Sequence, residues 1–102
     1  MSKRLAYLEK VTSEGSTDSF TWYALGMEYK GLARVDDALA AFTKLRGFDP
    51  GYVPMYLMCG TLLADAQRAD EAREWLTAGE ATASKKGDSK ALGEIREALA
   101  KL

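Results

Sequence analysis

Residues that could carry out nucleophilic or acid–base chemistry are few in this chain. Its 102 residues include no histidine and a single cysteine, Cys59, so no Cys–His pair and no histidine base is available. Cys59 stands among apolar residues at a packing position, and this context favours a buried structural role over a nucleophilic one. The sequence contains no glycine-rich phosphate loop and no metal-ligand spacing. We therefore predict a protein that is not an enzyme, with no catalytic residues, no metal site and no cofactor.

Two pairs of acidic residues, Asp36–Asp37 and Asp70–Glu71, recur at an interval of 34 residues. Neighbouring carboxylates can act as a general acid and a general base. Each pair, however, comes at the start of a predicted helix, where negative charge interacts favourably with the helix dipole. We interpret both pairs as features of helix starts. The arginine before each pair could have a structural role or contact a partner.

Composition and charge indicate an ordinary globular protein. Hydrophobic residues make up 47% of the chain, and 14 basic residues nearly balance 15 acidic ones, for a net charge of −1. This balance argues against a protein that binds nucleic acid or a membrane surface. No apolar run is long enough for a signal peptide or a membrane span, and a single cysteine cannot form an internal disulfide. We expect a cytoplasmic protein.

Apolar residues recur at helical spacing between a few polar breaks, and no segment alternates as a strand would. The breaks are the polar stretch 12–19, the segment DPGYVP, in which both prolines lie, and KKGDS at 85–89. The pattern predicts an all-α fold whose helices span residues 2–13, 19–32, 35–48, 53–66, 69–86 and 89–102.

The sequence resembles itself when it is shifted by 34 residues. Trp22 then falls on Tyr56 and Gly26 on Gly60, and the small, large and charged positions that follow also agree in type. Such agreement in residue size is typical of a packed structural repeat. The signature in the first copy is Trp22-x2-Leu25-Gly26-x2-Tyr29, Ala38-x3-Phe42 and Pro50.

This signature resembles that of the tetratricopeptide repeat family, and all seven of its residue types are present. The resemblance implies an α-α superhelix made of helix-turn-helix repeats. We expect one domain over residues 1–102, with an N-terminal half-repeat helix (2–18), repeat 1 (19–52), repeat 2 (53–86) and a C-terminal capping helix (87–102). Two repeats are fewer than the usual minimum of about three, so both flanking helices should be needed for stability.

Within each expected repeat, a small residue on each helix would allow the two backbones to approach closely. Gly26 is expected to face Ala38, and Gly60 to face Ala72. Trp22, Leu25 and Tyr29 would pack beside the first of these contacts. Trp75 has two possible roles, as an exposed anchor for a partner or as a contact with the last helix.

The resemblance also implies a concave groove lined by the first helix of each repeat, which receives a peptide or an amphipathic helix of a partner protein. The residues expected to face this groove are Phe20, Tyr23, Met27, Lys30 and Arg34 from repeat 1, and Tyr52, Leu57, Met58, Thr61, Asp65 and Arg68 from repeat 2. We predict a protein-protein interaction module that acts as an adaptor or scaffold. The alternative is a self-associating structural subunit of a homo-oligomer or larger assembly.

Overall fold

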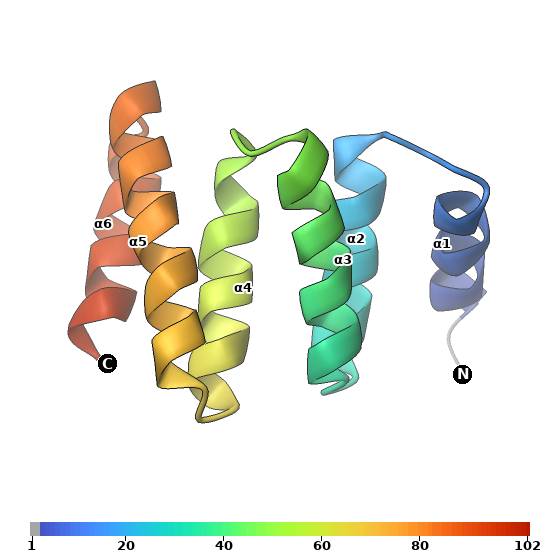
Figure 1. The fold of residues 1–102 in the computed structure, drawn as a ribbon, viewed down its shortest axis with the longest axis horizontal. Helices are drawn as coiled ribbons and strands as arrows, with labels where there is room; N and C mark the ends of the chain where they lie inside the picture. Colours follow the sequence, from blue (N-terminus) through green and yellow to red (C-terminus); the bar gives the residue numbers. More distant parts are fainter. Residues whose placement is uncertain (1–2) are drawn as a thin grey trace. The chain divides into compact units, whose positions relative to one another are not determined.

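In the computed structural model, which describes residues 3–102, the chain forms six α-helices. These helices are α1 (Lys3–Ser13), α2 (Ser19–Gly31), α3 (Val35–Phe48), α4 (Val53–Asp65), α5 (Ala69–Lys86) and α6 (Ser89–Ala100) (Figure 1). The predicted all-α fold is confirmed, and the predicted helix bounds differ from the observed ones by at most two residues. The predicted first residue of the first helix, residue 2, lies outside the described residues. The division into repeats and caps stays a prediction.

Two helices begin at an aspartate whose side chain caps the first turn. Oδ2 of Asp18 accepts hydrogen bonds from the backbone N of Thr21 at 2.9 Å and from its hydroxyl at 2.6 Å, and Oδ1 of Asp88 accepts one from the backbone N of Ala91 at 3.1 Å. The hydrogen bond from the Thr21 hydroxyl, followed by that from its backbone N–H, lowers the pKa of Asp18 below its usual value. These side chains satisfy backbone donors that a helix start leaves unpaired.

The turns that follow α2 and α4 share one left-handed geometry without a glycine. Ala33 has a φ of 57° and Gln67 a φ of 63°, in a region that side chains with a Cβ enter at a cost. In each turn, the N–H of the next residue donates to the carbonyl five residues before it, at 3.0 Å after α2 and 2.9 Å after α4. The two turns are therefore structural copies of each other, as the 34-residue self-similarity indicates.

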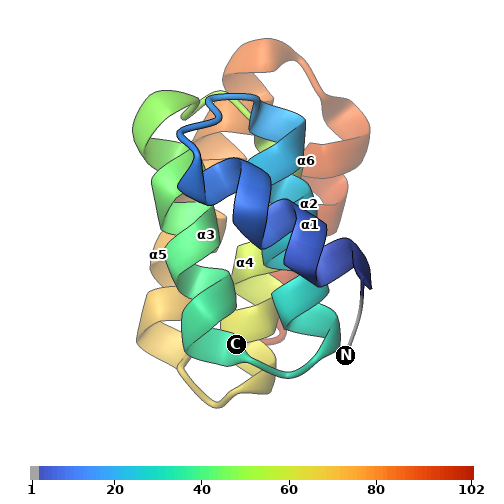
Figure 2. The same cartoon turned by 90° about the vertical axis from the view of Figure 1, so that its right-hand side faces the viewer.

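The chain divides into two compact units, which meet in sequence between Pro50 and Gly51. In the first unit, α2 and α3 pack side by side and α1 lies against α2 (Figure 2). The large side chains that are fully buried in this unit are Leu5, Phe42 and Leu45. The helix α2 adds buried apolar side chains, among them Leu25 and Tyr29, and a buried glycine.

That glycine, Gly26, lies against the ring of Phe42. A Cβ added to Gly26 would lie 2.5 Å from Cε1 of Phe42, and a Cβ added to Gly60 would lie 2.5 Å from Cγ of Leu76. The glycines were expected to face Ala38 and Ala72. The side chains nearest to them are instead Phe42 and Leu76, so that expectation is wrong. The large side chain one turn after the expected alanine fills the space that each glycine leaves.

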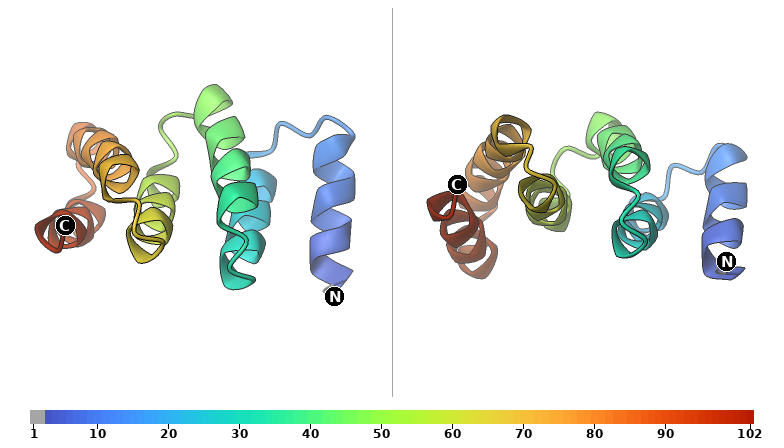
Figure 3. Two further views of the ribbon diagram at one scale, coloured as in Figure 1. Left: turned by 60° about the horizontal axis from the view of Figure 1, so that its bottom comes forward. Right: turned by 90° about the horizontal axis from the view of Figure 1, so that it is seen from below.

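The second unit has a third close approach, which involves all three of its helices. A Cβ at Gly79 would lie 2.5 Å from the Cβ of Tyr56 and 3.2 Å from Cδ1 of Ile95. Figure 3 shows α6 running beside α5, and α6 also contacts α4. Ile95 is fully buried in a cluster with Val53, Leu76 and Ala83, and the other apolar residues of α6 pack around it. The helix α6 therefore completes the apolar packing of this unit.

Trp75 belongs to the packing of the second unit. Its side chain is only 6% exposed, and its ring lies 6.0 Å from that of Tyr56 on α4. Its proposed role as an exposed anchor is therefore wrong. Among residues 3–102, no helix combines the length and the apolar character that crossing a bilayer requires.

Candidate partner-binding site

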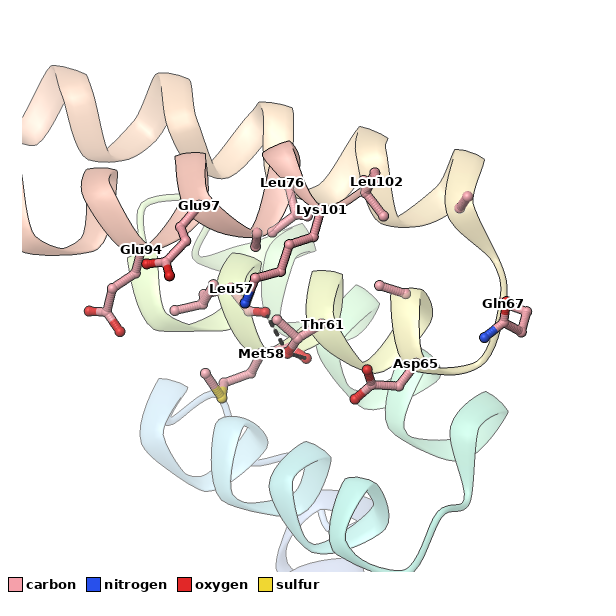
Figure 4. A pocket seen from close by; sticks show the side chains of 13 residues that line it. Leu57, Met58, Thr61, Asp65, Gln67, Leu76, Glu94, Glu97, Lys101 and Leu102 are labelled. Carbon is pink, nitrogen blue, oxygen red and sulfur yellow. Dashed lines mark hydrogen bonds between the residues drawn. The ribbon is translucent and has the colours of Figure 1, made fainter.

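An open pocket of about 800 Å³ lies between α4 and α6 in the second unit (Figure 4). The side chains that line it come from α4, the turn after it, the start of α5, and the exposed face of α6: Leu57, Met58, Thr61, Ala64, Asp65, Gln67, Ala69, Leu76, Glu94, Glu97, Ala98, Lys101 and Leu102. Its volume falls within the range of roughly 300–1,000 Å³ that is usual for ligand sites.

Four of the residues predicted to face a groove in repeat 2 line this pocket. They are Leu57, Met58, Thr61 and Asp65, all on α4. The first three are half-buried and Asp65 is exposed. Their intervals of three and four residues place them along one face of the helix, so they form a continuous wall.

The other two predicted residues of repeat 2 lie at the ends of α4, outside the pocket lining. Tyr52 is half-buried and directly precedes α4. Arg68 directly precedes α5 and binds Glu71 through two hydrogen bonds, from Nε at 2.7 Å and from Nη2 at 3.0 Å. Arg34 makes the corresponding contact in the first unit, with its Nε 2.9 Å from Oδ2 of Asp37. The recurring arginines thus have a structural partner within their own turn.

The polar groups of the pocket are mostly acidic. Asp65, Glu94, Glu97 and Lys101 are all exposed and leave the lining with a net charge of −2, from three carboxylates and one ammonium group. The hydroxyl of Thr61 donates to the backbone O of Leu57 at 2.9 Å, so its hydrogen is already used within the helix. Lys101 is therefore the one cationic side chain that lines the pocket.

The floor between these polar groups is apolar. Figure 4 shows Leu57 at the end of the α4 wall nearest Glu94 and Glu97, with Asp65 toward the other end. Leu76, Ala98 and Leu102 complete the apolar part of the lining. The arrangement can bind apolar side chains, while its charges favour cationic groups around them.

The α6 side of the pocket was missed by the sequence analysis, which assigned residues 87–102 only a capping role. Glu94, Glu97 and Lys101 had no role in that assignment. The α6 side of the pocket could have been found from Ala98 and Leu102, which are small or apolar and lie on the same face as those charges. A purely solvated face would not need them.

The predicted groove residues of repeat 1 lie on or near α2, and each has its own surroundings in the first unit. Phe20 is 61% exposed, and Tyr23 is half-buried with its ring 6.2 Å from the ring of Phe42. Met27 and Lys30 are half-buried, and Arg34 is exposed. The role of these residues in binding stays a prediction.

The signature aromatic residues of α2 are held by hydrogen bonds within the first unit. Nε1 of Trp22 donates to the backbone O of Ser16 at 2.7 Å, and the hydroxyl of Tyr29 donates to Oε2 of Glu9 on α1. Burial, followed by the hydrogen bond to Glu9, raises the pKa of Tyr29 to about 12. The guanidinium carbon of Arg34 lies 4.7 Å from the centre of the Tyr29 ring. These residues therefore fix α1 and its loop against α2.

Groups that could do chemistry remain sparse in three dimensions. Cys59 is buried, as the sequence predicted. Within residues 3–102, no three His, Cys, Asp or Glu side chains are grouped so that they could hold a metal ion. The geometry at the pocket is that of a binding surface.

Several solved structures are similar to this chain. A tetratricopeptide repeat domain protein from Salinibacter ruber is 36% identical, with 82% of this chain and 94% of that chain covered and a TM-score of 0.75. A solution structure of the same Salinibacter ruber domain protein gives the same identity and TM-score, with 85% of that chain covered.

A protein from Bordetella parapertussis is similar over more of the chain. It is 25% identical, and the match covers 99% of this chain and 88% of that chain with a TM-score of 0.84. No protein-family model and no curated protein sequence matches the chain. The identity and coverage of the Salinibacter ruber relative, together with the 34-residue signature, show that this chain belongs to the tetratricopeptide repeat family.

Proposed function

We propose that this protein is a non-catalytic, cytoplasmic adaptor that binds a peptide or an amphipathic helix of a partner protein. The observation that carries the proposal is the open pocket between α4 and α6, whose lining includes four of the predicted groove residues. Tetratricopeptide folds generally mediate protein–protein interaction, and the apolar floor of this pocket suits that role.

The apolar side chains of the pocket wall are suited to binding an apolar side chain of the partner. Leu57 and Met58 are half-buried, so part of each side chain remains available for a partner to cover. A methionine adapts its shape to different apolar groups more easily than a branched side chain does. A partner helix would place apolar residues at intervals of three and four along this wall.

A peptide selection would test the proposal without assuming a partner. Peptides are selected from a randomised displayed library on the immobilised protein, synthesised, and titrated against Leu57→Ala and Met58→Ala. We expect each variant to weaken binding about tenfold, since apolar anchors dominate such interfaces. Leu32→Ala, which truncates an exposed leucine of the first unit, is the matched control and should change affinity little. Peptides that bind both pocket variants and the control with equal affinity would contradict the proposal.

Self-association is a second candidate function, favoured by exposed aromatic side chains in the first unit. Tyr7 is 64% exposed and Phe20 is 61% exposed. Sedimentation equilibrium across a range of protein concentrations tests this alternative. A dimer that dissociates in the double variant Tyr7→Ala plus Phe20→Ala would support it, and a strict monomer at all concentrations would exclude it.

A further inference from the structure

The charges around the pocket between α4 and α6 indicate which class of partner segment it accepts. We infer that this pocket binds a cationic amphipathic segment, with apolar side chains on its floor and lysine or arginine beside its carboxylates. This inference rests on the proposed function, because it concerns the partner of the same site, and it adds the charge of that partner.

The first argument is the imbalance of charge at the pocket compared with the whole protein. The chain of 102 residues has a net charge of only −1, whereas the pocket lining alone has three carboxylates and one ammonium group. Acidic side chains are thus concentrated where the apolar floor is accessible. Such complementarity mainly sets which partner is accepted and how fast it associates.

The second argument is that the three carboxylates are exposed and have no ion pair within residues 3–102. Two ion pairs of the second unit join Arg68 to Glu71 and Arg96 to Glu80, and neither involves a residue of the pocket lining. Asp65, Glu94 and Glu97 can therefore form ion pairs with a partner without breaking existing ones.

The third argument is the placement of those carboxylates along the pocket. Leu57 and Asp65 are eight residues apart on α4, which corresponds to about 12 Å along the helix axis. Figure 4 shows Glu94 and Glu97 toward the Leu57 end of the pocket and Asp65 toward the other. A helical segment whose apolar residues span about two turns would bring cationic residues at both of its ends near these groups.

The pocket also offers few groups to an acidic segment. Lys101 is the one cation among the described residues of the lining, Gln67 adds an amide donor, and the hydroxyl of Thr61 donates to its own helix. An acidic segment would place its carboxylates beside Asp65, Glu94 and Glu97, and like charges at an interface oppose binding.

Two synthetic helical peptides of about 14 residues test the inference. Both carry leucines at intervals of three and four residues, and the remaining positions are all lysine in one peptide and all glutamate in the other. Each is labelled with fluorescein and titrated with the full chain by fluorescence anisotropy. We expect the lysine peptide to bind at least tenfold more tightly than the glutamate peptide.

Matched variants locate the effect. Glu94→Gln plus Glu97→Gln should weaken binding of the lysine peptide about threefold to tenfold and reduce its dependence on salt, as expected for two exposed ion pairs. The control double variant, Glu14→Gln plus Asp36→Asn, removes the same charge from exposed positions in the first unit and should leave the affinity nearly unchanged. Circular dichroism verifies that both double variants are folded.

The outcomes separate this inference from the proposed function. Equal or tighter binding of the glutamate peptide, with loss of affinity in Leu57→Ala, would overturn the cationic preference and leave the pocket as the binding site. Binding of the lysine peptide that both double variants weaken equally would reflect general attraction to an acidic protein and would overturn the inference. If neither peptide binds, the inference of a cationic partner is overturned as well. The peptides obtained by the library selection would still test whether the pocket is the binding site.

Discussion

The helix pairs α2–α3 and α4–α5 have matching turns and matching glycine contacts, but two of the buried positions at which they differ determine their neighbours. Tyr29 in the first pair corresponds to Leu63 in the second, and Leu45 corresponds to Gly79, at the 34-residue interval. In the first pair, the tyrosine hydroxyl binds α1 through Glu9. In the second pair, Gly79 allows close packing against Tyr56 on α4 and Ile95 on α6.

These differences show how one repeat can be adapted to two different neighbours. Both pairs bury apolar residues of their flanking helix. The first adds the hydrogen bond from Tyr29 to Glu9, and the second adds the close approach at Gly79. The second arrangement is also the one that has the pocket, because α6 supplies one of its walls. The shared positions maintain the helix pair, and the divergent ones determine what each pair holds. The following predictions test that separation, from the largest expected effect to the smallest.

Removal of residues 88–102 should have the largest effect. It exposes the cluster of Val53, Leu76 and Ala83, from which Ile95 is then missing. We expect a loss of more than about 3 kcal/mol in the free energy of unfolding, measured by urea denaturation. Ile95→Ala alone should cost about 2–5 kcal/mol. A truncated chain with unchanged stability would contradict the role of α6 in the second unit.

High pH should weaken the first unit through Tyr29. Burial and the hydrogen bond to Glu9 raise its pKa to about 12 in the folded protein, above the ordinary tyrosine value of 10.0. A raised pKa means that the stabilisation is fully present below pH 10 and is lost as the pH rises toward 12, by about 2 kcal/mol. Urea denaturation at several pH values measures this loss. Tyr29→Phe should show a smaller loss over the same range, and an equal loss in the variant would contradict the assignment to Tyr29.

Alanine at the close glycines should destabilise the protein in a graded way. Gly79→Ala places a Cβ against the Cβ of Tyr56, which cannot move without the backbone, so we expect a cost of about 2 kcal/mol. Gly26→Ala meets the far end of the Phe42 ring, and a gain in helix propensity offsets part of the clash. A net cost of about 1 kcal/mol is expected there. Thermal unfolding followed by circular dichroism measures both changes.

Gly93 provides the matched control for these substitutions. It lies inside α6, and nothing is within 4 Å of the position its Cβ would take. Gly93→Ala should raise stability by roughly 0.5–1 kcal/mol through helix propensity alone. If Gly79→Ala were as stable as Gly93→Ala, the close approach of the three helices would be wrong.

Glycine at the two left-handed turns should have the smallest effect, with the opposite sign. Ala33 and Gln67 both have positive φ, which glycine adopts without strain. We expect Ala33→Gly and Gln67→Gly each to stabilise the protein by about 0.5–1 kcal/mol, less the entropy that glycine adds to the unfolded chain. Equal gains in the two variants would show that the turns are energetically alike. A loss of stability in either variant would contradict this account.

The sequence predicted the helices and the family because these depend on local signals. Polar breaks separate the helical patterns, and the tetratricopeptide signature lies within one stretch of the chain. The partners of Gly26 and Gly60 were wrong by one turn. Residue size shows that two helices approach closely, but the point of closest approach depends on how the helices cross.

The site could be predicted only on the helix that carries the repeat pattern. The family resemblance implied Leu57, Met58, Thr61 and Asp65, whereas the α6 wall depends on how that helix packs after Gly79. The left-handed turns at Ala33 and Gln67 were also missed, because neither residue type favours positive φ. Three-dimensional packing overrode local preference in both cases.

Nuclear magnetic resonance with nitrogen-labelled protein tests the central claim, that the pocket between α4 and α6 is the binding site, most directly. The leucine–lysine peptide is added stepwise, and the shift of every assigned backbone amide is followed. The account predicts that the largest shifts fall on residues 57–65 of α4 and 94–102 at the end of the chain, and that Leu57→Ala diminishes them. Shifts centred on residues of the first unit, with those two segments unchanged, would contradict it.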